Sequence, residues 1–330
     1  MRALRALRAA LLAAVLVGLS ESSAAPEDGS ERMRVEMDSA GVQTADMAAK
    51  EAEAKAGMAE ELKDTLTDIM AVLQHGSDPS KDQAIGQLVQ IALQTSEAGS
   101  EQARMFRSAV VAGGALPSLI AVLRSDDATR QFLGVRALHA LAIDDPTTEL
   151  DNFHSEEICQ HGAVPLLVRA LSSEVEQLQA AATGALAQLA ENPTCQRMIV
   201  AEGAVKPLVG IASYADDMQK LGAMNALDVL AINNAKAREQ LQASGAAGVL
   251  KGIGTLGSGL LREQAIGFGE RLQGRAEPLS PEAHVQAARK TRIQYDSVRH
   301  RAMEMMRGWA DSEGGRGMGR GRGRGRGSPS

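Results

Sequence analysis

The chain has very few aromatic residues: four Phe, two Tyr and one Trp among 330 residues, or 2%. Sandwiches and barrels of this size depend on aromatic and β-branched side chains, so this scarcity argues against an all-β fold. Two cysteines are too few for a scaffold held together by disulfides. No apolar run reaches the roughly 18 residues that a transmembrane helix requires.

Motifs of the common catalytic sites are also missing. The chain has no Gly-x-Ser-x-Gly, no His-Glu-x-x-His and no Walker loop. A Gly-x-Gly-x-x-Gly pattern occurs at residues 252–257, but no β-rich segment precedes it, and we interpret it as a loop between helices. His154, Cys159 and His161 lack the second cluster that a structural zinc site needs. We therefore expect a protein that is not an enzyme and has no cofactor or metal.

The residues that dominate instead are Ala, Leu, Glu, Gln and Met, all strong helix formers, which predicts an all-α fold. The net charge is −6 and is unevenly distributed. Residues 280–330 have eleven basic and five acidic side chains, so residues 1–279 have a net charge of −12. An acidic body with a basic C-terminal region indicates two different surfaces.

The N-terminus has the pattern of a secretory signal peptide. Arg2, Arg5 and Arg8 precede an apolar run over residues 9–19, and Ala24/Ala25 offers a small-residue cleavage site. We predict a signal peptide at residues 1–25 and a location in the secretory pathway, in the ER lumen or outside the cell, with no membrane span after cleavage. The arginines also share one helical face, so an organelle transit peptide is one alternative, and an uncleaved or cytosolic N-terminus is the other.

Two motifs recur along the chain with matching spacing. Gly-Ala pairs open four segments, at Gly114, Gly162, Gly203 and Gly245. An Ala-Leu-x-x-Leu-Ala motif follows three of them, starting at Ala137, Ala185 and Ala226. Both motifs are separated first by 48 and then by 41 residues, so they belong to one internal repeat.

One repeat is expected to contain three helices. A short first helix, such as Thr194 to Ala201, ends at Gly203, where a left-handed C-cap suits glycine. Pro207 then lies in the first turn of the second helix, where its missing N–H has little cost. The third helix contains the Ala-Leu-x-x-Leu-Ala motif as a buried stripe. A single repeat cannot bury its apolar face alone, so neighbouring repeats must stack.

This unit resembles the armadillo repeat, with its period of about 42 residues, its three helices and its Gly-Ala-x-x-Pro-Leu-Val turn. Residues 201–209 are the best copy. The resemblance covers about residues 60–275 and implies a right-handed superhelix of about five units, the first of them degenerate. An insertion near residues 144–152 would explain the longer spacing of 48.

The predicted organisation places this solenoid at residues 61–275. Residues 26–60 form an acidic segment, expected to be partly disordered and partly helical. Ser280-Pro281 can cap a basic C-terminal helix at residues 280–310, and the sequence leaves open whether it packs on the solenoid. Residues 311–330 are a Gly/Arg-rich tail, expected to be disordered.

The resemblance also implies a concave surface, lined by third helices, that binds an extended peptide or a folded lobe of a partner. In the nuclear-import receptors of the family, ladders of Trp and Asn on these helices hold the cargo. The matching positions here are Arg136, Gly184 and Asn225, and Ala140, Gln188 and Val229. The ladders are absent, so binding of nuclear signals is not implied. We predict groove contacts at Phe132, Arg136, Gln188 and Asn225, with ordinary solvent-facing positions as the alternative.

The two cysteines, Cys159 and Cys195, fall in first helices of adjacent units. A disulfide is conceivable in an oxidising lumen. Their distances to the following Gly-Ala pair differ, which separates them along the helix axes, so we expect two buried thiols.

The tail has five arginines separated by glycine, at Arg316, Arg320, Arg322, Arg324 and Arg326. Such a segment is expected to be a solvated, weakly adhesive tail, with binding to an acidic protein surface or to single-stranded RNA as the alternatives. A secretory location argues against RNA. The leading hypothesis is a non-enzymatic scaffold that binds a partner protein in the secretory pathway. The layout is also similar to armadillo-type nucleotide-exchange factors for heat-shock chaperones, of which one branch works in the ER lumen. RNA association through the tail is the third possibility.

Overall fold

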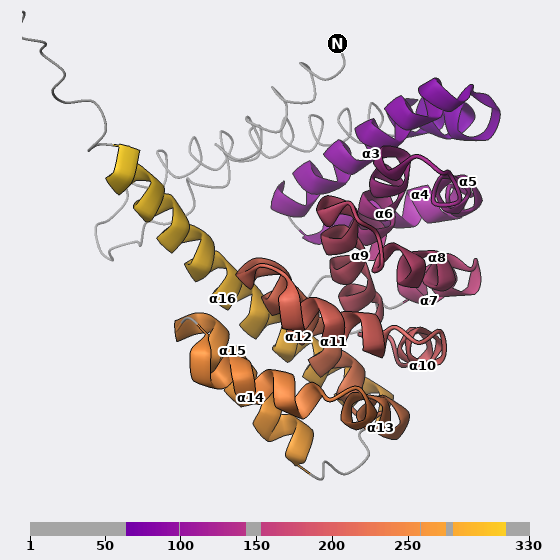
Figure 1. The fold of residues 1–330 in the computed structure, drawn as a ribbon. Coiled ribbons are helices and arrows are strands. Elements are labelled where there is room, and N and C mark those ends of the chain that lie inside the picture. The colour runs from indigo at the N-terminus through magenta and orange to yellow at the C-terminus, as the bar shows by residue number, and fades with distance from the viewer. Residues whose placement is uncertain (1–63, 99, 143–152, 258, 275–279, 315–330) are drawn as a thin grey trace, which may run out of the picture. The chain divides into compact units, whose positions relative to one another are not determined.

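The computed structural model describes residues 64–98, 100–142, 153–257, 259–274 and 280–314 (Figure 1). All regular structure in these residues is α-helical, with no β-strand, as the composition predicted. The chain forms two compact units, residues 1–163 and 164–330, each described here by itself. The predicted signal peptide, the acidic segment, the insertion and the arginines of the tail lie outside the described residues.

The first unit contains a helix at residues 64–75 and the helices α3 (Asp78–Ala98), α4 (Ser100–Ala112), α5 (Leu116–Val122), α6 (Ala128–Ala142) and α7 (Phe153–Gln160). Helix α3 packs against α4 and α6. Arg130 of α6 forms ion pairs with Asp78 and Asp82 of α3, each at 3.0 Å. These contacts join the third helices of two successive repeats.

The second unit contains α8 (Ala163–Ala170), α9 (Glu176–Leu189), α10 (Pro193–Ala201), α11 (Val205–Tyr214), α12 (Asp217–Ala231), α13 (Ala235–Ala243), α14 (Ala246–Leu256), α15 (Gly259–Gln273) and α16 (Pro281–Gly314). Helix α12 is central, since it packs against α9, α11, α15 and α16 (Figure 1). None of the described helices in either unit is both long and apolar enough to cross a bilayer.

The turn between first and second helices is built as the repeat predicted. The glycine of each Gly-Ala pair has a left-handed backbone, with φ of +80° at Gly114, +85° at Gly162, +82° at Gly203 and +73° at Gly245. After α10, the N–H of Ala204 donates to the carbonyl of Ile199 at 3.3 Å, a Schellman-type closure. The repeated glycine therefore ends each first helix and reverses the chain.

The third helices are α3, α6, α9, α12 and α15, and the three that contain the motif bury the stripe that the sequence predicted. All four motif residues of α6, α9 and α12 are buried, with Leu138, Leu186 and Leu227 at most 2% exposed. Small Ala side chains in the stripe let neighbouring helices approach closely. The succession of these helices corresponds to the expected five units.

Two interpretations from the sequence were wrong. Residues 252–256 of the Gly-x-Gly-x-x-Gly pattern are the end of helix α14, and only Gly257 lies beyond it. The buried stripe of Ala246, Leu250 and Ile253 keeps this segment helical despite its glycines. The described residues also include no free cysteine, because Cys159 and Cys195 are disulfide-bonded as well as fully buried. Their different distances from the following Gly-Ala pair therefore do not prevent disulfide bonding.

Candidate protein-binding surfaces

The first predicted groove residues, Phe132 and Arg136, lie one turn apart on α6 in the first unit. Both side chains are half-buried, while Val135 and Leu138 beside them are buried in the core. The guanidinium carbon of Arg136 lies 5.8 Å from the centre of the Phe132 ring, within the range of a cation–π contact. This contact places a positive charge over an aromatic ring on the third helix of its repeat.

The other two predicted groove residues lie in the second unit and are buried. Gln188 of α9 and Asn225 of α12 are each 4% exposed. Arg292 of α16 donates from Nη1 to Gln188 Oε1 at 2.6 Å. Helix α16, which the sequence left unplaced, therefore packs on the third-helix face of α9 and α12. Gln188 and Asn225 are therefore too buried to offer a partner a direct contact in this structure.

A buried ion pair fixes α16 on this face. Arg292 Nη1 lies 3.1 Å from Glu191 Oε1, and the Glu191 side chain is 1% exposed. Burial raises the pKa of Glu191 to about 7, although Arg292 and then Arg289 oppose this shift. The raised pKa shows that the positive charges only partly offset the loss of water.

Two further contacts show the direction of α16. Near its start, His284 is buried, with Nε2 3.4 Å from the carbonyl oxygen of Ala190 at the end of α9. Farther along, the hydroxyl of Tyr295 lies against Gly222 of α12, 3.4 Å from where a Cβ would stand. Helix α16 therefore runs from the C-terminal end of α9 toward the N-terminal part of α12. Burial lowers the pKa of His284, so its ring is neutral on this face.

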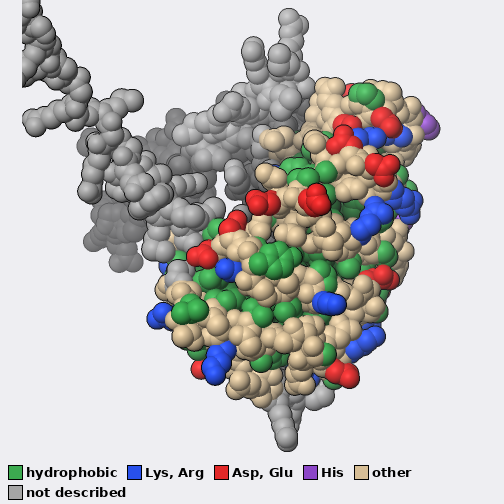
Figure 2. All heavy atoms as spheres, in the orientation of Figure 1, with side chains coloured by type: hydrophobic (Ala, Val, Ile, Leu, Met, Phe, Trp, Pro, Cys, Tyr) green, Lys and Arg blue, Asp and Glu red, His purple; other side chains and the backbone are tan. Residues whose placement is uncertain are grey.

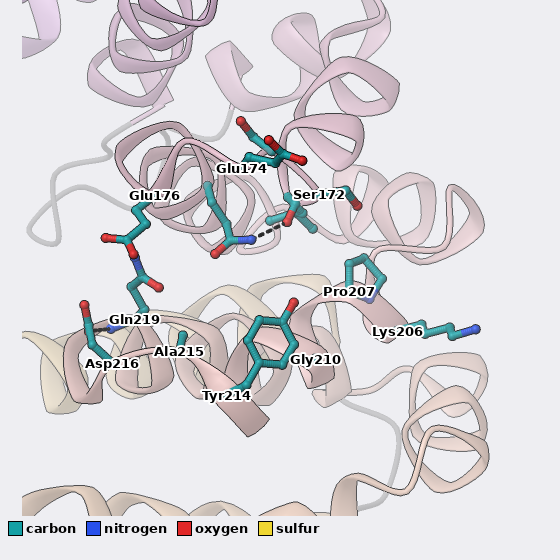
Figure 3. Close-up of a pocket in the computed structure, with 13 residues that line it drawn as sticks. Ser172, Glu174, Glu176, Lys206, Pro207, Gly210, Tyr214, Ala215, Asp216 and Gln219 are labelled. Atoms are coloured by element: carbon teal, nitrogen blue, oxygen red, sulfur yellow. Dashed lines mark hydrogen bonds between the residues drawn. The ribbon is translucent and has the colours of Figure 1, made fainter.

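A second surface lies in the same unit, between the α8–α9 turn and the α11–α12 turn. There a pocket of about 740 Å³ is lined by residues of both turns and of α9, α11 and α12. Its charged lining residues are Glu174, Glu176, Asp216 and Lys206, so the pocket is acidic. In Figure 3, Tyr214 points from α11 toward the turn with Ser172 and Glu174, while Glu176 faces Gln219.

Local structure explains how these pocket residues are placed. Asp216 caps α12, since its Oδ1 accepts a hydrogen bond from the Gln219 N–H at 2.8 Å. Tyr214 ends α11 and lies over Gly210, where a Cβ would come within 3.3 Å of the ring. The Tyr214 side chain is nevertheless 73% exposed, and Val175 on the opposite turn is 39% exposed. Figure 2 shows that such apolar patches reach the surface between charged side chains.

The comparison with known families agrees with this repeat geometry. Residues 154–191, which cover α7, α8 and α9, match the model of the armadillo/β-catenin-like repeat. The chain thus contains an armadillo repeat at residues 154–191 and has the armadillo fold. Over 97 residues it is 32% identical to vacuolar protein 8 of Candida albicans, which amounts to 29% of this chain and 17% of that protein. The chain thus matches only a small part of this relative's length.

Solved armadillo structures share the fold. A designed armadillo repeat protein in complex with the peptide (KR)4 superposes with a TM-score of 0.54 at 19% identity, over 65% of this chain and 86% of that one. The armadillo-repeats-only protein ARO from Plasmodium falciparum gives 0.53 at 18% identity, over 63% and 93%. At these identities the likeness establishes the fold alone.

The two histidines of the candidate zinc cluster contact neighbouring polar groups. His154 Nε2 lies 3.0 Å from the Ser108 hydroxyl, and His161 Nδ1 lies 2.8 Å from the carbonyl oxygen of Glu157. Across the described ranges no group of three potential ligands comes together around a metal-sized space.

Sequence reasoning missed the acidic pocket and the seat of α16. The pocket joins turns of successive armadillo units, so its residues are about 40 positions apart and share no motif. The buried side of α16 mixes polar and apolar residues: His284, Ala288, Arg289, Thr291 and Val298. Ile293 on the same helix is 54% exposed. Because part of this face is polar, hydrophobic periodicity alone could not define it.

Proposed function

We propose that this chain is a non-enzymatic scaffold that binds a partner protein through the third-helix surfaces of its armadillo units. The observation that carries the proposal is α16 on α9 and α12. It shows that this surface accepts a protein helix through a buried ion pair, Arg292 with Glu191, and a hydrogen bond to Gln188. Helix α16 is a segment of the same chain, and a partner would use the corresponding surface elsewhere.

The corresponding surface of the first unit is that of α6, with Phe132 and Arg136. A stacked cation and ring offer a partner both an apolar face and hydrogen-bond donors for a carboxylate. Among the armadillo proteins of similar fold, one is in complex with a peptide and another was designed for modular peptide recognition. We therefore propose an extended peptide or a folded lobe of a protein as the ligand.

We place this function in the secretory pathway. The signal-peptide pattern of residues 1–25 supports this location. The disulfide-bonded state of both cysteines also supports it, since disulfides persist in oxidising compartments and are rare in the cytosol. Expression of the full chain in eukaryotic cells, followed by N-terminal sequencing, tests the location. A chain cleaved near Ala24/Ala25 is expected, and an intact N-terminus in the cytosol would contradict it.

The partner is tested by affinity capture on the full chain and mass spectrometry. Three baits are compared: the wild type, the double variant Phe132→Ala/Arg136→Ala, and the control Arg124→Ala, which removes an exposed arginine of the same unit. A partner of the α6 surface is retained by the wild type and the control, and reduced about tenfold on the double variant. Equal capture on all three baits would refute the α6 surface as the site.

The same experiment separates the scaffold from the nucleotide-exchange alternative. A lumenal heat-shock chaperone that is retained without ATP and released by ATP would identify an exchange factor. Capture of a different protein of the secretory pathway, unaffected by ATP, would support the general scaffold.

A further inference from the structure

The acidic pocket of the second unit has the chemistry of an arginine-binding site. Its lining includes three carboxylates, those of Glu174, Glu176 and Asp216, and one lysine, Lys206. Carboxylates bind guanidinium groups through paired, charge-assisted hydrogen bonds. Tyr214 is 73% exposed and lies over Gly210, so one face of its ring is available to stack on a planar cation.

The chain contains a segment with the matching chemistry. Residues 315–330 have five arginines and no acidic residue, and a glycine stands on both sides of each arginine from Arg316 to Arg326. Glycine presents no side chain, so a Gly/Arg backbone can approach the pocket wall closely while alternate residues deliver guanidinium groups.

Helix α16 leads this segment to the correct end of the unit. It runs toward the N-terminal part of α12, and the acidic rim lies where α9 and α12 begin, at Glu176 and Asp216. From Tyr295, beside Gly222, to Gly314 the helix advances about 28 Å, while Asp216 lies only about 9 Å beyond Gly222 in the same direction. Sixteen residues can span about 50 Å when extended, so residues 315–330 are long enough to turn back to the pocket.

We propose that the Gly/Arg tail, residues 315–330, binds in the acidic pocket of its own chain, with guanidinium groups on Glu174, Glu176 and Asp216 and one of them stacked on Tyr214. The tail then neutralises this pocket and closes it to other basic segments. A partner with a stronger basic segment has to compete with it. The proposal concerns a surface other than the third-helix face and does not depend on the proposed function.

The test measures binding of a fluorescent peptide with the sequence of residues 312–330 to full-length chains. In the wild type the attached tail competes, so the peptide should bind weakly. A chain in which the five tail arginines are replaced by glutamine should bind the peptide at least about tenfold more tightly, because the competing segment has a high effective concentration. Adding Glu174→Gln, Glu176→Gln and Asp216→Asn to that chain should weaken binding about tenfold again.

Controls separate the pocket from general electrostatics. Asn keeps the helix cap at position 216, so the pocket variant retains α12. A matched control, Glu202→Gln/Glu239→Gln/Glu263→Gln, removes three exposed carboxylates elsewhere in the unit and should leave peptide binding unchanged. Limited trypsin digestion of chains with the wild-type tail gives a second measurement: the tail should be cleaved faster in the pocket variant than in the wild type.

Three results would overturn the proposal. In the first, the pocket variant and its control bind the peptide equally. In the second, the wild type and the glutamine-tail chain bind the peptide equally. In the third, oligouridine RNA binds the wild type and the pocket variant with the same affinity, and tryptic cleavage of the tail is also the same in both. The tail would then be an RNA-binding segment with no site on its own chain.

Discussion

The buried carboxylate under α16 allows a quantitative prediction about pH. Glu191 is 1% exposed on its side chain and has a pKa raised from 4.5 to about 7 by burial, against the opposing charges of Arg292 and Arg289. Substitution by glutamine keeps the shape of the side chain and its capacity for hydrogen bonds, and removes the titration. The difference in unfolding free energy between the wild type and Glu191→Gln therefore isolates this one group.

The sign follows from proton binding. Between about pH 4.5 and pH 7 the folded wild type retains the Glu191 proton, whereas the unfolded chain has lost it. The stabilising contribution of the protonated carboxyl is thus complete below about pH 4.5 and is lost as the pH rises through about 7. The shift corresponds to about 3 kcal/mol, so the wild type should lose about that much stability relative to Glu191→Gln across this window.

Urea unfolding followed by far-UV circular dichroism, at closely spaced pH values, measures this difference. Because both proteins are compared at each pH, other titrations such as that of His284 cancel. Glu202→Gln, an exposed carboxylate after α10, is the control for the loss of a surface charge. If the curves of the wild type and Glu191→Gln run parallel over the whole window, the burial of Glu191 does not raise its pKa and the reasoning fails.

Other changes test the remaining structure. Arg271→Ala should destabilise the second unit by about 3 kcal/mol, because it leaves the buried Asp228 carboxylate without the guanidinium that binds both its oxygens. Thermal melting measures this loss of stability. Recovery of stability in Arg271→Ala/Asp228→Asn would confirm that the unpaired carboxylate is the cause. Gly203→Ala should lower the free energy of unfolding by about 1–2 kcal/mol, because residue 203 has a left-handed backbone. Gly248→Ala should raise it by about 0.5–1 kcal/mol, because Gly248 is helical and a Cβ there would meet no atom within 4 Å. Maleimide labelling of the denatured, unreduced chain should find no free thiol, and reduction should lower the melting temperature; labelling of both cysteines would contradict the bonded state.

The repeat architecture could be predicted from the sequence because its signals are local. A left-handed glycine such as Gly203 and an Ala-Leu-x-x-Leu-Ala stripe each report on residues a few positions away. Their spacing then fixed the succession of units. The Gly-rich end of α14 was misread since glycine suggests loops, while the buried Leu250 and Ile253 outweigh that preference.

The candidate sites were less predictable since they depend on contacts between distant segments. Gln188 and Asn225 lie on third helices as the sequence placed them, but nothing local indicates that both are buried or that α16 binds Gln188. The decisive contacts join residues 94 to 104 positions apart and are polar, so neither periodicity nor motif spacing marks them. Phe132 and Arg136, by contrast, are one turn apart and half-buried, and their role as contacts stays a prediction.

The return of α16 to α9 and α12 also bears on how the second unit folds. In a simple repeat array each unit contacts only its neighbours, so folding can start anywhere and spread. Here the pairing of Arg292 with Gln188 closes a separation of 104 residues, which raises the contact order and slows this step. During synthesis, Arg292 leaves the ribosome about 5–20 s after Gln188, so this contact can form only after that delay. We expect this long-range contact to make the second unit unfold in a single cooperative transition rather than repeat by repeat.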